Sequence, residues 1–162
     1  MTEAIPVHDP SELTRFIEIR YHIRHRESLP DLAKMARQVE DLHFGDDSVP
    51  EGLSDLLQRM IGEMEAHMKQ EELVLFPAIR KAGASDLDTP IAVLRADHER
   101  QESDLAEVRR LTGGLAVPDR ACRTWAELYA GPTEFMADLE EHMRLENDLL
   151  FPQFETTAAQ TA

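Results

Sequence analysis

The stretch Met64–Pro77 (MEAHMKQEELVLFP) aligns without gaps with Leu139–Pro152 (LEEHMRLENDLLFP), 75 residues further along the chain. Each copy contains a histidine followed four residues later by a glutamate, and each ends in Leu-Phe-Pro. Residues i and i+4 lie on the same face of a helix, so each copy turns one imidazole and one carboxylate to the same side. This internal duplication predicts two helices that meet at a shared polar centre.

Helical periodicity extends through most of the chain, and no convincing alternating strand pattern interrupts it. Pro30 is expected to kink or split the first helix near Leu29, and Gly131-Pro132 to bend or restart the last one. Short loops between consecutive helices make the neighbours antiparallel. The predicted fold is all-α, an antiparallel up-down four-helix bundle with helices over residues 11–43, 51–76, 90–112 and 119–151.

One domain is expected, because 162 residues are enough to bury a core. The bundle is predicted over residues 11–154, between an N-terminal extension of residues 1–10 and a disordered tail of residues 155–162. No apolar run is long enough to span a bilayer, and the first residues show no signal-peptide pattern. A single cysteine, Cys122, agrees with a reducing compartment, so a cytoplasmic location is expected. No long apolar stripe calls for a dimer, which favours a monomer.

The chain is strongly acidic, with a formal net charge of −15 at pH 7. Binding to a phosphate backbone needs a basic face, so the charge argues against nucleic acid as a partner. An anionic membrane surface is disfavoured for the same reason. The acidity by itself indicates solubility rather than a particular chemistry.

Six polar residues occupy positions that helical periodicity reserves for the core, and they form the pattern His…His-x-x-x-Glu twice. Four imidazoles and two carboxylates buried without partners would each cost about 1–3 kcal/mol. A pair of metal ions removes that cost, and helical bundles hold di-iron and di-manganese sites with nitrogen and oxygen ligands of this kind. The histidine-rich set favours iron over manganese, while zinc and copper remain compatible with it. The candidate ligands are His22, His67, Glu71, His98, His142 and Glu146.

His43 follows His22 by three heptads, so on a continuous helix it would lie about 31 Å away along the axis. If Pro30 folds the segment back, His43 would instead become a fifth histidine at the metals. His25, between two arginines, is expected on a basic surface.

Glu63 and Asp138 each lie one turn before a histidine of the duplication, at matching places. They are candidate proton relays, and Asp97, next to His98, is a candidate hydrogen-bond partner of a ligand. The alternative for all three is a solvated charge on a helix surface.

The ligand pattern resembles the hemerythrin-like HHE cation-binding domain. More narrowly, the stretches RYHIRHRESLPDLA, EAHMKQEELVLFP, ACRTWAELYAG and EHMRLENDLLFP are similar to the repair of iron centres (RIC) di-iron proteins, and the resemblance covers about residues 17–153. It implies two iron ions with an oxo or hydroxo bridge, four histidine ligands and Glu71 and Glu146 as bridging carboxylates. His43 matches a histidine common in that family. Longer members carry an N-terminal cysteine-containing domain, which this chain is expected to lack.

The resemblance implies a role in nitrosative or oxidative stress, with repair of damaged iron–sulfur centres, reduction of nitric oxide at the di-iron site, or both. Two six-coordinate irons would each keep one open position with the six ligands and the bridge, which suits two nitric oxide molecules bound side by side. A fifth histidine would leave one open position, which suits reversible dioxygen binding. The alternatives are therefore an oxygen-binding or sensing protein and an iron-storage or iron-donor protein without catalysis.

Overall fold

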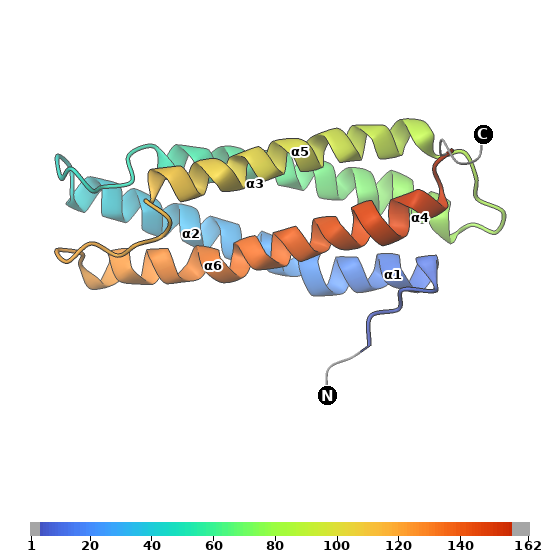
Figure 1. Ribbon diagram of the computed structural model, residues 1–162, viewed down its shortest axis with the longest axis horizontal. Coiled ribbons are helices and arrows are strands. Elements are labelled where there is room, and N and C mark those ends of the chain that lie inside the picture. Colours follow the sequence, from blue (N-terminus) through green and yellow to red (C-terminus); the bar gives the residue numbers. More distant parts are fainter. Residues whose placement is uncertain (1–3, 157–162) are drawn as a thin grey trace.

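Four long helical segments run alternately up and down the long axis of the molecule (Figure 1). The computed structural model describes residues 4–156, and within them every regular element is helical. The all-α antiparallel bundle predicted from the sequence is confirmed. The elements are α1 (Pro10–Ile17), η1 (Glu18–His22) and α2 (Ile23–Leu42) in the first segment; α3 (Leu53–Gln70), η2 (Glu71–Leu75) and α4 (Phe76–Arg80) in the second; α5 (Asp88–Leu111) in the third; and α6 (Arg123–Arg144), η3 (Leu145–Leu150) and η4 (Phe151–Gln153) in the fourth.

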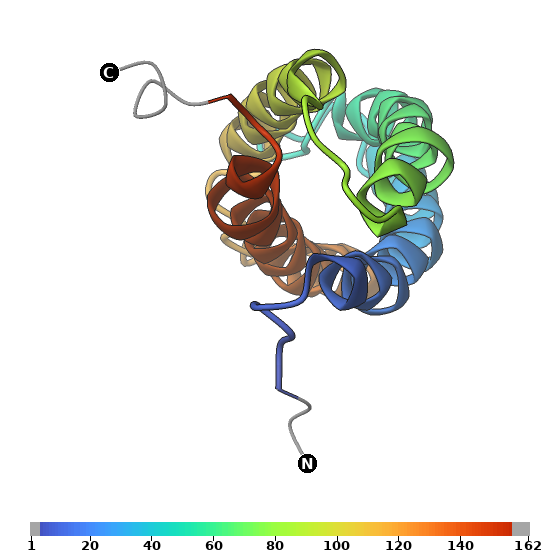
Figure 2. The ribbon, with the colours of Figure 1, turned by 90° about the vertical axis from the view of Figure 1, so that its right-hand side faces the viewer.

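Viewed from one end, the four segments stand at the corners of a square (Figure 2). Helix α2 packs against α3 and α6, and α5 packs against α3 and α6 from the opposite corner. Each helix therefore has two neighbours and turns one stripe towards the shared axis, which is where the buried side chains lie. Within residues 4–156, no helix combines the length and the apolar character needed to cross a membrane.

Pro30 and Pro132 lie inside continuous helices, so the predicted split near Leu29 is wrong. Proline removes one hydrogen bond from a helix interior, but tertiary packing on both sides of each proline offsets that loss. Close packing is visible at Gly131, where an added Cβ would lie 2.6 Å from Cδ2 of Leu32. The packing of α2 against α6 therefore leaves no room for a side chain at Gly131.

The predicted disordered tail falls mostly on residues 157–162, which lie outside the described residues. The part that is described makes contacts with the bundle. Glu155 forms an ion pair with Arg95 at 2.6 Å, and the N–H of Thr156 donates to the carboxylate of Asp88 at 2.7 Å. The polypeptide therefore stays attached to α5 beyond the predicted end of the bundle at residue 154.

The apolar core is divided into two clusters by a layer of buried polar residues. One cluster gathers around Trp125, Met60 and Leu139, and the other around Phe76 and Phe151. Along each of the four segments, the buried polar residues lie between the part that belongs to one cluster and the part that belongs to the other. The middle of the bundle is therefore dry, polar and covered at both ends by packed apolar side chains.

Candidate metal centre

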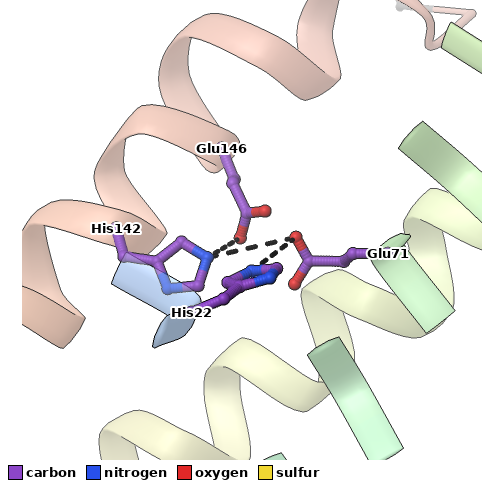
Figure 3. A group of neighbouring side chains, drawn as sticks. All are labelled: His22, Glu71, His142 and Glu146. Carbon is purple, nitrogen blue, oxygen red and sulfur yellow. Dashed lines mark ion pairs between the residues drawn. The ribbon is translucent and has the colours of Figure 1, made fainter. Parts of the chain in front are cut away.

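The polar layer contains two groups of four side chains whose nitrogen and oxygen atoms lie within 4.8 Å of one another. Glu71 and Glu146 belong to both groups, so the two groups share their carboxylates. Figure 3 shows the first group, in which two imidazoles from the first and fourth segments face the two carboxylates. The first group is His22, Glu71, His142 and Glu146, and the second is His67, Glu71, His98 and Glu146.

All eight converging atoms lack a hydrogen-bond partner, although they are buried. They are the four histidine Nε2 atoms and the four carboxylate oxygens. Nε2 of His142 lies 3.1 Å from Oε1 of Glu146, and Nε2 of His98 lies 3.0 Å from the same oxygen. Unpaired buried polar atoms are costly, and a set of four imidazole nitrogens and two carboxylates is what transition-metal ions take as ligands. The donor atoms therefore fit a pair of metal ions that share two carboxylates.

Each of the four imidazoles is held from behind through its other ring nitrogen. A hydrogen bond at Nδ1 fixes the tautomer and leaves the Nε2 lone pair facing the centre. The Nδ1 partners are Glu72 for His22 at 2.6 Å, Asp97 for His67 at 3.0 Å, Asn147 for His98 at 2.7 Å and His25 for His142 at 3.1 Å.

Of these four partners, the sequence indicated only Asp97. Glu72 and Asn147 were missed, although a signal was present, since both directly follow a glutamate of the duplication and occupy equivalent places in it. His25 was expected at the surface between two arginines. It is instead buried, with 1% of its surface exposed, and its ring stacks on His142 with 5.3 Å between centroids.

Three of the four segments widen into a π-helical turn at a candidate ligand. His22 lies in η1, Glu71 in η2 and Glu146 in η3. The carbonyls of Glu71 and Glu146 accept from the N–H groups of Phe76 and Phe151, five residues further on. Single π-helical turns of this kind gather at functional sites, because they alter the direction of side chains along a helix.

The Leu-Phe-Pro ending of the duplication accounts for two of these turns, η2 and η3, and for part of the packing. Proline donates no hydrogen bond and pushes away the carbonyl four residues before it, which suits a widened turn just ahead of Pro77 and Pro152. The phenylalanines cover the imidazoles, because Phe76 stacks on His22 at 5.9 Å and its counterpart Phe151 stacks on His98 at 5.6 Å. The repeated motif therefore shapes the backbone and closes the polar layer.

His43 does not reach the centre. It caps the C-terminus of α2, where its Nε2 lies 3.2 Å from Sγ of Cys122 and its ring packs on Trp125. Folding back at Pro30 was the condition for a fifth histidine ligand, and α2 continues straight through Pro30 as one helix. The structure therefore places His43 with the far apolar cluster instead of with the candidate ligands.

The two candidate proton relays are engaged by arginines outside the centre. Glu63 pairs with Arg59 and keeps 44% of its side chain exposed. Asp138 pairs with Arg20 at 3.1 Å and with Arg24 at 3.4 Å. Neither carboxylate belongs to the two buried groups. Glu63 is a charge on the helix surface, whereas Asp138 is only 15% exposed, and the relay role of both stays a prediction.

In the metal-free protein the buried carboxylates draw protons onto two of the imidazoles. Burial alone would lower the pKa of His67, but the charge of Glu71 and the hydrogen bond to Asp97 outweigh it and raise the pKa to about 10. Burial is likewise outweighed at His142, where the charge of Glu146 raises the pKa to about 9. Burial would raise the pKa of Glu146, but the positive charge of His142 holds it well below its usual value.

These shifts predict how the stability of the metal-free protein depends on pH. The folded pKa values of His67 and His142 lie above 6.5, so the folded state binds more protons than the unfolded state between pH 6.5 and about 10. Their stabilising contribution is complete below pH 6.5 and is lost as pH rises through about 9 to 10. We expect the denaturant midpoint of the chelator-treated protein to fall between pH 7 and pH 10. A midpoint that rises over this range would contradict the prediction.

Comparison with known proteins supports a cation site. Residues 17–154 match the family model described as Hemerythrin HHE cation binding domain. The chain is 43% identical over 143 residues to the Iron-sulfur cluster repair protein YtfE of Yersinia pseudotuberculosis (serotype O:1b, strain IP 31758), and equally to that of Yersinia pestis (strain Pestoides F). The alignment covers 88% of this chain and 65% of each relative, so the chain spans slightly less than two thirds of the length of these curated relatives.

Proposed function

This chain belongs to the family of hemerythrin HHE cation-binding domains, and from that premise we propose that it is a non-haem di-iron protein that repairs iron–sulfur centres under nitrosative or oxidative stress. The observation that carries the proposal is the convergence of eight buried, unpartnered nitrogen and oxygen atoms from all four segments. The two Yersinia relatives are named as iron–sulfur cluster repair proteins, which supports the repair role.

The proposed ligand sets follow the two groups of side chains. His22 and His142 would hold one iron, His67 and His98 the other, and Glu71 and Glu146 would bridge them, with an oxo or hydroxo group as the third bridge. Bound ferrous iron would supply a Lewis acid, two reducing electrons and the metal that a damaged cluster has lost.

The surrounding residues orient the ligands and keep the centre dry. Hydrogen bonds at Nδ1 hold all four imidazoles with Nε2 inward, and the stacked Phe76 and Phe151 cover two of them. Arg26 binds the carboxylate of Glu72 through both of its terminal nitrogens, at 2.8 and 2.9 Å, and so holds the acceptor of His22 in place. The protein is therefore built to present ligands at a fixed geometry.

Iron transfer tests the proposal. With dithionite present to supply the one electron that each [3Fe–4S]⁺ cluster needs besides Fe²⁺ to become [4Fe–4S]²⁺, the ferrous-loaded protein is expected to restore the absorbance and activity of an enzyme whose cluster has lost one iron, up to the amount of iron that the protein carries. The same protein loaded with zinc is the matched control and is expected to restore nothing, since zinc fits the ligands but cannot complete the cluster. Recovery no faster than with the same iron held by a small chelator would contradict the proposal.

Nitric oxide reduction is the second candidate, and the ligand count favours it. Each group supplies two histidines and shares two carboxylates, and neither His25 nor His43 is placed as a further ligand. If two irons were bound, these residues would leave room in the coordination shell of each for a small ligand such as nitric oxide. Nitrous oxide released when the reduced protein meets nitric oxide would distinguish this activity from iron donation alone.

Reversible oxygen carriage is disfavoured by the same count, because the fifth histidine that would close one iron is absent from both groups. The remaining expectations from the sequence stay part of the proposal. A cytoplasmic monomer is the proposed working form, since a lone cysteine suits a reducing compartment. Damaged iron–sulfur proteins are the proposed partners.

A further inference from the structure

The duplication repeats the ligands but not everything that holds them. His22 and His98 are equivalent, and their Nδ1 partners Glu72 and Asn147 are equivalent too. The other pair of equivalent imidazoles differs. Nδ1 of His67 meets the carboxylate of Asp97 at 3.0 Å, whereas Nδ1 of His142 meets Nε2 of His25 at 3.1 Å.

The ring of His25 is buried and is packed against aromatic rings on two sides. Its ring stacks on His142 and meets Phe135 edge-on, with 5.4 Å between centroids, and only 1% of the residue is exposed. His25 follows His22 by three residues, and Gln101 follows His98 by three, so Gln101 is the equivalent of His25. Gln101 is also buried. Among the hydrogen bonds of residues 4–156, Gln101 makes none to a candidate ligand. His25 therefore serves one of the two metal positions and not the other.

The chemistry of the acceptor decides how strongly a ligated imidazole binds. When Nε2 binds a metal, Nδ1 carries the proton and donates it; a carboxylate acceptor makes the ring more basic than a neutral acceptor does. His142 donates to a neutral imidazole. His67 donates to Asp97, whose carboxylate has Arg100 as its other ion-pair partner among residues 4–156, and Arg100 is 65% exposed and so well screened.

The remaining acceptors do not reverse this difference. At the position of His22 and His142, the anionic acceptor is Glu72, but both terminal nitrogens of Arg26 bind it, and Arg26 is only 33% exposed. This guanidinium, which Glu65 also binds, neutralises part of the charge that Glu72 would otherwise present to His22. At the position of His67 and His98, the neutral acceptor Asn147 leaves the effect of Asp97 in place.

A pocket lies next to His25, behind the metal position of His22 and His142. It has a volume of about 270 Å³ and lies between α2 and α3. His25 and Arg26 form part of its wall, beside the apolar side chains of Leu29, Met64 and Met68. The pocket wall therefore includes His25, the outer partner of His142, and Arg26, which binds the outer partner of His22.

We infer that the two metal positions are inequivalent and that the ion held by His22 and His142 leaves before the ion held by His67 and His98, with His25 as the positioning residue that sets the difference. The inference rests on the proposed di-iron function and names which iron would be given up first. Each ion has one ligand with a carboxylate acceptor and one with a neutral acceptor. The difference is that Glu72 is bound by the more buried Arg26 whereas Asp97 meets the more exposed Arg100, and that the pocket is lined by His25.

Chelation kinetics test the inference. The protein is loaded anaerobically with two equivalents of ferrous iron and mixed with an excess of a chelator that absorbs when it binds ferrous iron. Two phases of about one iron each are expected, with rates that differ at least about tenfold, since outer hydrogen-bond partners change metal affinity by about 10–100-fold. Zinc loading with a zinc-sensitive chelator repeats the measurement without redox chemistry.

Four variants assign the phases. His25→Leu is expected to speed the fast phase by about tenfold or more and to leave the slow phase unchanged, while His25→Gln, which keeps a polar group, has a smaller effect. Asp97→Asn is expected to speed the slow phase. Gln101→Leu, at the position equivalent to His25, is the matched control and should change neither phase.

A single phase for both irons would overturn the inference, and so would a slow phase that responds to His25→Leu while the fast phase does not. If His25→Leu does not fold, His25→Gln and Asp97→Asn decide instead: the first should speed only the fast phase and the second only the slow phase. The proposed function can fail separately: two distinct phases without any iron transfer to a damaged cluster would end that function and leave the inequivalence standing. Iron transfer to a damaged cluster, together with a single release phase, would support the proposed function and overturn the inequivalence.

Discussion

Loading the protein with two ferrous ions is expected to raise its midpoint of thermal unfolding by about 15–30 °C. A ligand at 1,000 times its dissociation constant stabilises the folded state by about 4 kcal/mol per site. Two such ions supply about 8 kcal/mol, and each kcal/mol moves the midpoint of a domain of this size by about 2–4 °C. The physical reason is local, because eight unpartnered atoms in the dry middle of the bundle gain a ligand.

Anaerobic thermal scans followed by circular dichroism measure this effect on chelator-treated and iron-loaded protein. Magnesium is the matched control, since it prefers oxygen ligands in an octahedral shell and binds poorly to imidazole. It should leave the midpoint within a few degrees of the metal-free value. Equal midpoints with and without iron would remove the basis for a metal centre in this chain.

Replacing one shared carboxylate is expected to disable both metal positions at once. Glu146 belongs to both groups, and its Oε1 lies 3.1 Å from Nε2 of His142 and 3.0 Å from Nε2 of His98. Glu146→Gln keeps the size of the side chain but removes its negative charge and one of the shared oxygens. We expect the bound iron to fall from two ions to at most one. Affinity should fall by more than the roughly 10–100-fold typical of outer partners.

Metal analysis after anaerobic loading and desalting gives the stoichiometry directly. Glu141→Gln is the matched control, because Glu141 lies on the same segment and pairs with the half-exposed Arg144 at 2.7 Å, outside both groups. This control should retain two irons. Two tightly bound irons in Glu146→Gln would show that Glu146 is not a shared ligand.

The fold could be predicted from the periodicity of the sequence, because helix formation depends on local rules. Apolar residues at helical spacing, prolines and glycines at the turns and short loops leave few arrangements other than an antiparallel bundle. Errors arose where packing overrides a local preference. Pro30 was expected to kink or split its helix and Pro132 to bend or restart its own, but packing of nearby residues against neighbouring helices keeps each helix continuous, so the split and the restart are wrong.

Part of the candidate site could also be predicted from the sequence. Helical spacing singles out His67 with Glu71 and His142 with Glu146, since i and i+4 share a face whatever surrounds the helix. The structure brings these side chains together with His22 and His98. Spacing says nothing about side chains that meet from different helices, so the placement of His25 behind His142 and of His43 beside Cys122 could not be predicted.

The sequence by itself determined the all-α bundle and a central layer of four histidines and two glutamates, because both follow from periodicity along one chain. Only the tertiary structure decided how these residues combine. Each group joins a histidine from one half of the duplication to a histidine from the other, His22 with His142 and His67 with His98. The physical reason is that the partners of a side chain are set by which helices stand next to each other and by the widened turns at η1, η2 and η3, and neither is written in the spacing of residues along one helix.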